Sequence, residues 1–205
     1  MEEENQPASL GQGGEKRSLK TEITKKYIPF VWEVLKIFII ASVIVLPIRY
    51  FLFQPFIVKG DSMVPNFQSG DYLIVDELSY RFSDPQRGDI IVFKYPKDTT
   101  QRFIKRVIGL PGETIDIQNG NVTISKNEKS FILDEKYLPA NLKTFGDIHA
   151  IMANDEFFVL GDNREFSYDS RAWGSVPRKD IIGKALFRIL PIAALAEFQT
   201  PNYSY

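Results

Sequence analysis

Residues 114–125 read Thr-Ile-Asp-Ile-Gln-Asn-Gly-Asn-Val-Thr-Ile-Ser. Apolar and polar residues alternate on both sides of Asn119-Gly120, and both positions of this dipeptide accept the positive φ angles of a two-residue hairpin turn. The stretch predicts two antiparallel strands, 114–118 and 121–125. Further short runs of strand character are 72–75, 90–93, 103–108, 156–161 and 185–190. No segment after residue 60 has a long helical period, so the predicted fold class is mainly β: a compact antiparallel, barrel-like sheet domain preceded by one N-terminal helix.

That helix is predicted from an apolar stretch before the strands. Spanning a bilayer core takes about 20 helical residues, and residues 28–48 supply this length with only Glu33 and Lys36 charged. These two side chains are three positions apart and can pair on one helix face. One alternative is a buried core helix, since two charges interrupt the stretch. A cleaved signal peptide is the other, but the polar leader is too long for one and no small-x-small cleavage site follows the apolar run. A retained transmembrane anchor is the better interpretation.

The polar leader indicates how this anchor is oriented. Residues 1–26 have no apolar period, which is typical of disorder. The basic residues that lie close to the anchor are Lys16, Arg17, Lys20, Lys25 and Lys26. Positive charge beside a span favours the cytoplasmic side. We therefore predict a disordered cytoplasmic tail (1–26), a transmembrane anchor (27–54) and an exported β-rich domain (55–205).

The composition excludes several kinds of chemistry. The 205 residues include 25 basic and 26 acidic side chains, a net charge of −1, so no overall field recruits nucleic acid. The chain has no cysteine and a single histidine, His149, which excludes disulfides, cysteine catalysis and multi-histidine metal sites. No metal or cofactor is predicted. Any serine nucleophile must use His149 or a lysine as its base.

One serine and one lysine have a suitable setting for such a pair. Ser62 lies in Gly-Asp-Ser-Met-Val-Pro (60–65), soon after the apolar stretch, and Lys105 lies between Phe103-Ile104 and Val107-Ile108. A lysine acts as a base only when it is neutral, and an apolar setting lowers its pKa. Taken singly, such residues are more often turn serines and surface lysines, and the histidine lies in no motif. Together the two suggest a peptide-bond hydrolase working at a membrane face.

Four motifs occur in order along the chain. They are residues 60–65, Ser-Gly-Asp-Tyr (69–72), the run 87–94 that continues through 103–113, and Gly-Asp-Asn-Arg-Glu-Phe-Ser-Tyr-Asp-Ser-Arg-Ala-Trp-Gly (161–174). In order and spacing this set closely resembles the conserved boxes of bacterial type I signal peptidases, the leader peptidases with a serine–lysine dyad. The resemblance covers nearly everything from the anchor to about Pro191.

The resemblance implies a role for each matching residue. Ser62 would be the nucleophile, Lys105 its general base, and Ser167 the second serine that hydrogen-bonds the lysine. The backbone N–H of Ser62 would donate to the tetrahedral oxyanion. The residues implied in oxyanion or structural support are Gly60, Asp162, Asn163, Arg164, Asp169 and Arg171, and the last two match an ion pair that braces the loop.

Two positions depart from the family pattern. Some members have a serine two residues before the nucleophile, whose hydroxyl completes the oxyanion hole, but this chain has Gly60 there. The second oxyanion donor therefore stays open, with water or another amide as candidates. Asn66 stands where threonine is usual, which leaves the local capping open and implies no catalytic role.

The resemblance also implies the substrate and the location. Family members cut after a small-x-small motif, usually Ala-x-Ala, and the residues expected to build two shallow pockets are Phe56, Val58, Met63, Phe67, Val92, Phe103 and Ile104. Two or three of these could be ordinary core residues. The implied partners are exported preproteins with signal peptides and membrane phospholipid, with the enzyme acting as a monomer. The implied location is the plasma or inner membrane, as a single-pass protein, or a thylakoid membrane in a cell that has one.

Two other functions compete with this interpretation. One is a catalytically silent, membrane-anchored module that binds signal peptides or a translocation partner, which Gly60 alone favours. The other is a soluble serine–lysine self-cleaving regulator. Such regulators carry a DNA-binding helical module, but residues 1–55 show neither a basic helical face nor a helix-turn-helix.

Overall fold

The computed structural model describes residues 13–47, 53–140, 142–190, 196–197, 200, 201 and 203. The chain divides into two compact units, Met1–Ile48 and Arg49–Tyr205. Three predicted features fall partly outside the described residues: positions 1–12 of the tail, positions 48–52 of the anchor, and most of the apolar C-terminal end of the β-rich domain.

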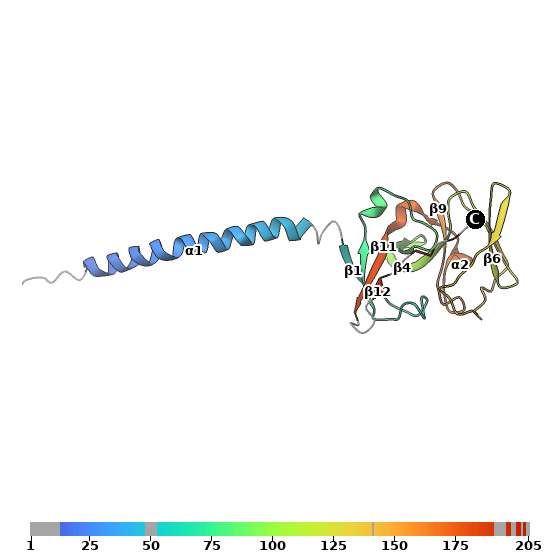
Figure 1. Ribbon diagram of the computed structural model, residues 1–205, viewed down its shortest axis with the longest axis horizontal. Helices are drawn as coiled ribbons and strands as arrows, with labels where there is room; N and C mark the ends of the chain where they lie inside the picture. The colour runs from blue at the N-terminus through green and yellow to red at the C-terminus, as the bar shows by residue number, and fades with distance from the viewer. Residues whose placement is uncertain are drawn as a thin grey trace, which may run out of the picture. The chain divides into compact units, whose positions relative to one another are not determined.

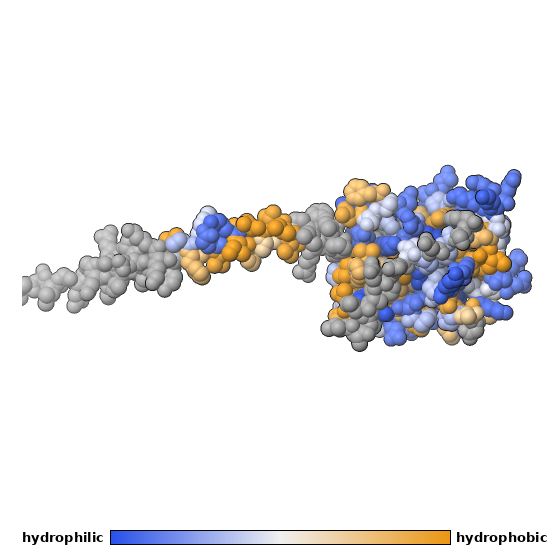
Figure 2. Space-filling model, in the orientation of Figure 1, coloured by the Kyte–Doolittle hydropathy of each residue, from blue (hydrophilic) through white to orange (hydrophobic). Residues whose placement is uncertain are grey.

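The described residues of the N-terminal unit form one helix, α1 (Gly13–Pro47) (Figure 1). Its segment Ile28–Leu46 is long and apolar enough to cross a membrane, and its side chains are largely exposed, so the structure does not support a buried core helix (Figure 2). The predicted pairing of Glu33 with Lys36 is confirmed, with 2.7 Å between Oε1 and Nζ. Residues 13–26, which belong to the tail predicted to be disordered, form the first part of α1. An apolar helix already nucleated nearby extends readily through residues of good helix propensity.

The β-rich unit contains two antiparallel sheets. The larger has eight strands in the order β1-β2-β11-β3-β4-β9-β10, with β12 paired to β11. Its strands are β1 (Phe53–Ile57), β2 (Tyr72–Asp76), β3 (Ile90–Tyr95), β4 (Asp98–Gly109), β9 (Glu156–Leu160), β10 (Val176–Pro177), β11 (Ile181–Leu190) and β12 (Ala196–Glu197). Short helical turns connect some of them: η2 (Ser79–Arg81), α2 (Ser170–Trp173) and η3 (Arg178–Asp180).

The smaller sheet has the order β7-β6-β5-β8 and lies at the end of the unit away from β1 (Figure 1). Its strands are β5 (Thr114–Gln118), β6 (Asn121–Lys126), β7 (Lys129–Ile132) and β8 (Ile148–Ile151). The predicted hairpin is confirmed, because β5 pairs with β6 and Gln118 lies opposite Asn121. Asn119 and Gly120 have φ angles of 52° and 85°, as the turn requires.

The mainly β fold class is confirmed, and so are the strands predicted from alternation. The predicted end of the anchor overlaps the first strand, because Phe53 and Gln54 were assigned to the anchor but are the first two residues of β1 (Phe53–Ile57). A short apolar run has the same composition in a strand as in a helix, so periodicity could not separate them. The strands β7 and β8 were not predicted, because each is only four residues long.

Three buried apolar clusters support the two sheets, and one of them lies beneath the candidate site. Its members come from β2, β3, β4, β11 and the segment after β1: Val58, Met63, Phe67, Leu73, Val75, Ile90, Val92, Ile104 and Ala185. Because these side chains are close-packed, the backbone on either side of them is held in one arrangement. The cluster thereby positions the segment that carries Ser62 against the middle of β4.

Candidate active site

Ser62 begins a turn that follows β1 and is held by its buried neighbours. Met63 and Phe67 are 1% and 0% exposed, and the Phe67 amide donates to the Met63 carbonyl at 2.9 Å. Gly60 has a φ of 85°, a left-handed conformation that glycine adopts without strain. The Ser62 side chain is half-buried and is left facing β4.

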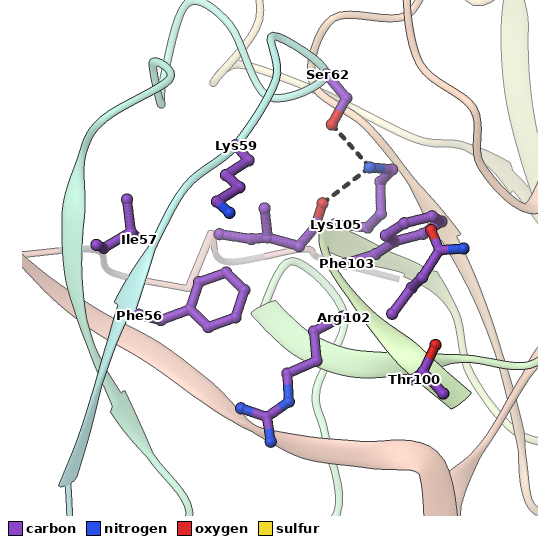
Figure 3. Close-up of a pocket in the computed structure, with 10 residues that line it drawn as sticks. Phe56, Ile57, Lys59, Ser62, Thr100, Arg102, Phe103 and Lys105 are labelled. Carbon is purple, nitrogen blue, oxygen red and sulfur yellow. Dashed lines mark hydrogen bonds between the residues drawn. The ribbon is translucent and has the colours of Figure 1, made fainter. Parts of the chain in front are cut away.

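Lys105 lies on β4 and is almost completely buried, at 4% exposure. Its Nζ lies 2.7 Å from Ser62 Oγ and donates to the Ile104 carbonyl at 3.0 Å (Figure 3). Burial lowers the pKa of Lys105 to about 8, although the negative charges of Asp169 and Asp162 act in the opposite direction. A lysine with this pKa is neutral in a useful fraction of molecules near pH 7 to 8, and its lone pair can accept the serine proton.

His149 has a different environment from this pair. It lies on β8 of the smaller sheet, its side chain is 63% exposed, and Nδ1 is 2.6 Å from Asp116 Oδ1. Of the two bases that the sequence left open, Lys105 is the one that contacts Ser62 Oγ.

Ser167 does not make the hydrogen bond expected of it. Its Oγ is buried and has no hydrogen-bond partner among the described residues, while Lys105 Nζ is directed at Ser62 and Ile104. Ser167 nevertheless lies at the site. A Cβ added to Gly161 would clash with both Ser167 Oγ and the Ser62 carbonyl oxygen, so all three positions are adjacent.

An ion pair braces the loop that carries Ser167. Arg171 Nε donates to Asp169 Oδ1 at 2.8 Å, and its Nη2 donates to the Arg164 carbonyl at 2.6 Å. Asp169 also accepts from the Gly161 amide at 3.1 Å and from the Arg171 amide at the start of α2. The loop from 161 to 171 is thereby closed on itself. Within the same loop, the fully buried side chain of Arg164 forms an ion pair with Glu135.

Asp162 connects the loop to both catalytic candidates. Its carboxylate accepts two hydrogen bonds from Arg106, at 2.8 and 2.7 Å, beside Lys105 on β4. It accepts a third from Asn66 Nδ2 at 2.8 Å, in the turn that starts at Ser62. The next residue, Asn163, donates its amide to the Ser62 carbonyl at 3.0 Å. The sequence left the local role of Asn66 open. In the structure its side chain connects the turn that carries Ser62 to Asp162.

A cavity of about 490 Å³ opens beside the pair. The lining residues are Phe56, Ile57, Lys59, Ser62, Thr100, Gln101, Arg102, Phe103, Ile104 and Lys105 (Figure 3). Three predicted pocket residues are among them: Phe56, Phe103 and Ile104. The other four do not line the cavity and pack in the core cluster beneath it: Val58, Met63, Phe67 and Val92.

Half of the lining was missed by sequence reasoning: Ile57, Lys59, Thr100, Gln101 and Arg102. These residues immediately follow or precede predicted ones on the same segments. A signal was present, because the strand holding Lys105 could have been extended toward residue 98. The sequence could not separate the four core residues from the lining residues, because an apolar residue near a site looks the same in sequence whether it faces a cavity or the core.

The backbone near Ser62 offers one amide for a developing negative charge. In the described part of the chain the Ser62 N–H has no hydrogen-bond acceptor, which leaves it free to donate to an oxyanion. The Gly60 N–H is engaged by Ser69 Oγ at 3.3 Å. Among the same described residues, no group of three acidic or histidine side chains is arranged to hold a metal ion.

A mainly antiparallel β domain with a buried serine–lysine pair beside a cavity has the chemistry of a hydrolase. The chain belongs to the signal peptidase family, peptidase S26, whose model matches residues 31–190. It is 40% identical over 179 residues to "Probable signal peptidase I-1" of Synechocystis sp., covering 80% of this chain and 87% of the relative. It is 41% identical over 169 residues to signal peptidase I of Leptolyngbya laminosa, covering 79% and 81%.

A solved structure also matches. The crystal structure of a signal peptidase I from Enterococcus faecalis has 33% sequence identity and a TM-score of 0.42, and the match covers 50% of this chain and 97% of that chain.

Family membership makes this chain an enzyme of the protease class, as predicted, and does not favour the silent binding module. Together with the apolar helix Ile28–Leu46, it indicates a membrane-anchored protein.

Proposed function

We propose that this enzyme removes N-terminal signal peptides from exported preproteins, with Ser62 as nucleophile and Lys105 as general base. The observation that carries the proposal is the 2.7 Å separation of Lys105 Nζ from Ser62 Oγ at a lysine that is 4% exposed. Family membership supports the substrate class, because the relatives at about 40% identity are signal peptidases.

In the proposed reaction, neutral Lys105 takes the Ser62 proton as Oγ attacks the scissile carbonyl carbon. The negative charge that forms on the carbonyl oxygen is stabilised by the Ser62 amide. Lys105 then returns the proton to the leaving amine as the C–N bond breaks, which leaves an acyl-enzyme. Water, deprotonated by Lys105, attacks this ester. Lys105 passes the proton to Ser62 Oγ as the ester C–O bond breaks, and the signal peptide leaves with a free carboxylate.

The strand arrangement supports binding of the substrate as an extended segment. β1 is the last strand of its sheet, and residues 98–105 of β4 pair with β3 on one side only in the described part of the chain. Both open edges border the cavity (Figure 3). A peptide lying between them would gain main-chain hydrogen bonds, and its alternate side chains would enter the apolar lining. Phe56, Phe103 and Ile104 are proposed to narrow this lining so that only alanine-sized groups fit, as cleavage after Ala-x-Ala requires.

The contacts around Ser62 and Lys105 support a role for each of the other predicted site residues. Ser167 is proposed to orient Lys105 when substrate is bound, since its buried hydroxyl has no other partner among the described residues. Asp162, Asn163 and the Asp169–Arg171 pair are proposed to hold the serine turn, β4 and the loop in register.

The proposed topology follows the charge around the helix. Residues 1–26 would be cytoplasmic, 27–54 would include the membrane span, and 55–205 would form the exported peptidase domain. In the structure α1 begins at Gly13 and β1 begins at Phe53. A plasma, inner or thylakoid membrane satisfies this arrangement. We propose that the enzyme acts as a monomer, in contact with phospholipid.

The test is cleavage of a purified Ala-x-Ala preprotein by the full chain in detergent, with the cut located by mass spectrometry. Ser62→Ala and Lys105→Ala are each expected to abolish the cut. Lys105→Arg should also fail, because a guanidinium stays protonated. Lys94→Ala, at an exposed lysine of the neighbouring strand, is the matched control and should cleave like the parent.

Circular dichroism of each variant separates loss of chemistry from loss of fold. A cut at another position, or substantial cleavage by Lys105→Ala, would contradict the assignment. A well-folded parent that cleaves nothing with added phospholipid would move the proposal to the silent binding module.

A further inference from the structure

Two cations stand at the mouth of the active-site cavity. Lys59 and Arg102 both line it, both are exposed, and they come from different segments, Lys59 from just beyond β1 and Arg102 from β4 (Figure 3). No aspartate or glutamate is among the ten lining residues. Neither Lys59 nor Arg102 forms an ion pair within the described part of the chain.

The nearby acidic residues have other positions or partners. Asp98, at the start of β4, accepts hydrogen bonds from Thr100 and Gln101. Asp61 is adjacent to the nucleophile in sequence but does not line the cavity. The mouth therefore has a net positive charge that no side chain lining it neutralises.

The two cations are placed at equal distances along the chain from the reacting groups. Lys59 precedes Ser62 by three residues, and Arg102 precedes Lys105 by three. On β4, which is extended, three residues span about 10 Å, whereas Lys59 is separated from Ser62 by the bend at Gly60. The cations also share the cavity with Phe56, Phe103 and Ile104, which are proposed to receive the small side chains before the cut. A substrate side chain near them would thus lie on the signal-peptide side of the scissile bond.

We propose that Lys59 and Arg102 select substrates with an acidic side chain four or five residues before the cut. This inference rests on the proposed function and adds a preference for one kind of substrate side chain. A carboxylate at the mouth would face two cations from opposite walls, while its own backbone continues along the open strand edges. Electrostatic complementarity of this kind adds to specificity more than to affinity.

The test compares peptides that differ only at positions 4 and 5 before an Ala-x-Ala cut, with glutamate, glutamine or lysine there. At low ionic strength the parent should show a kcat/KM for the glutamate peptide about three- to tenfold above that for the lysine peptide, as expected for two exposed charge pairs. The preference should fall as salt is added. The double variant Lys59→Glu/Arg102→Glu should reverse the ratio.

A matched control is the double variant Lys94→Glu/Lys97→Glu, which reverses two exposed charges that do not line the cavity. It should keep the parent's ratio. Because each ratio is taken within one protein, a change in overall activity does not affect it. Equal rates of the parent on the glutamate and lysine peptides, or an unchanged ratio in Lys59→Glu/Arg102→Glu, would overturn the proposal.

Two arms separate this inference from its alternatives. Binding of the same peptides to Ser62→Ala, measured by fluorescence anisotropy, tests the charge preference even if the parent cleaves nothing, in which case only the proposed function has failed. Vesicles with and without phosphatidylglycerol test whether the cations bind a lipid surface. Because the apolar helix keeps the full chain in the vesicle, the readout is the cleavage rate. A rate increase with phosphatidylglycerol that is lost in Lys59→Glu/Arg102→Glu, without any peptide preference, would assign the cations to the membrane and refute selection of substrate.

Discussion

Lys105 shows how burial changes the chemistry available to one side chain. Its flanking residues are apolar in sequence, and this was sufficient to predict a lysine with a lowered pKa. The sequence could not show that the neighbouring Arg106 is buried as well, nor that it pairs with Asp162 from a distant loop. Those two facts depend on tertiary packing. They explain how a neutral amine and a permanent cation occupy consecutive positions of one strand.

The first prediction at this scale concerns pH. Cleavage needs neutral Lys105, and with a pKa of about 8 its neutral fraction rises from about one in eleven at pH 7 to one half at pH 8. We expect kcat/KM to rise about fivefold over this interval and to level off above pH 9. A pH–rate profile with a peptide that has no titrating groups measures this. A flat profile from pH 6 to 9 would contradict a neutral lysine base.

The second prediction concerns stability. The folded-state pKa of Lys105, about 8, lies below the ordinary value of 10.5. Between these values the unfolded chain binds more protons, so stability from this group is full above pH 10.5 and is lost as pH falls toward 8. Lys105→Met should therefore stabilise the protein at pH 7 by about 1–3 kcal/mol.

Urea unfolding measures this difference, and it should shrink above pH 10. Lys94→Met, at an exposed lysine, is the control and should leave the unfolding midpoint nearly unchanged. A destabilised Lys105→Met at pH 7 would show that the buried amine is charged and well paired.

Among the elements, the loop 161–171 organises the site more than any strand does. Its residue Asp162 is 0% exposed and holds Arg106 of β4 and Asn66 of the serine turn. The motif that contains the loop could be recognised in sequence, but its partners could not, because they lie about a hundred and about sixty positions earlier in the chain. Local patterns predicted the hairpin of β5 and β6 correctly, since its turn and alternation lie within one short segment.

The third prediction tests this loop. Asp162→Ala leaves the Arg106 guanidinium buried without its counterion, and removal of one partner of a buried pair costs about 3–5 kcal/mol. We expect a loss of this size in the free energy of unfolding, measured in denaturant. Asp84→Ala provides the comparison, because Asp84 is 81% exposed where it meets Arg178 and its loss should cost under about 1 kcal/mol. Equal effects of the two variants would disprove the brace.

At the scale of the whole molecule, the β-rich unit contains its own core. All three buried clusters consist of residues between 58 and 185, and none of their members comes from α1. The sequence assigned the first two residues of β1, Phe53 and Gln54, to the anchor. Apolar residues on both sides of positions 48–52 belong to two different units, and composition does not separate them.

The fourth prediction follows from that separation. A fragment of residues 49–205 should unfold cooperatively and should still cut a soluble Ala-x-Ala peptide. It should act more slowly than the full chain on preproteins inserted in vesicles, because loss of a shared membrane lowers the effective concentration of the two partners. Thermal unfolding and paired cleavage assays measure both effects. A fragment that fails to fold would show that α1 contributes to the core.

The open edges of β1 and β4 have a consequence when no substrate is present. Unpaired strand edges are sites of edge-to-edge aggregation, and natural sheets protect them with lysines and other charges. Lys59 and Arg102 lie at these two edges. When two copies approach each other edge to edge, like charges meet and repel. The two charges thereby oppose self-association of the substrate-free enzyme, and a polyanion that masks these cations should promote its aggregation.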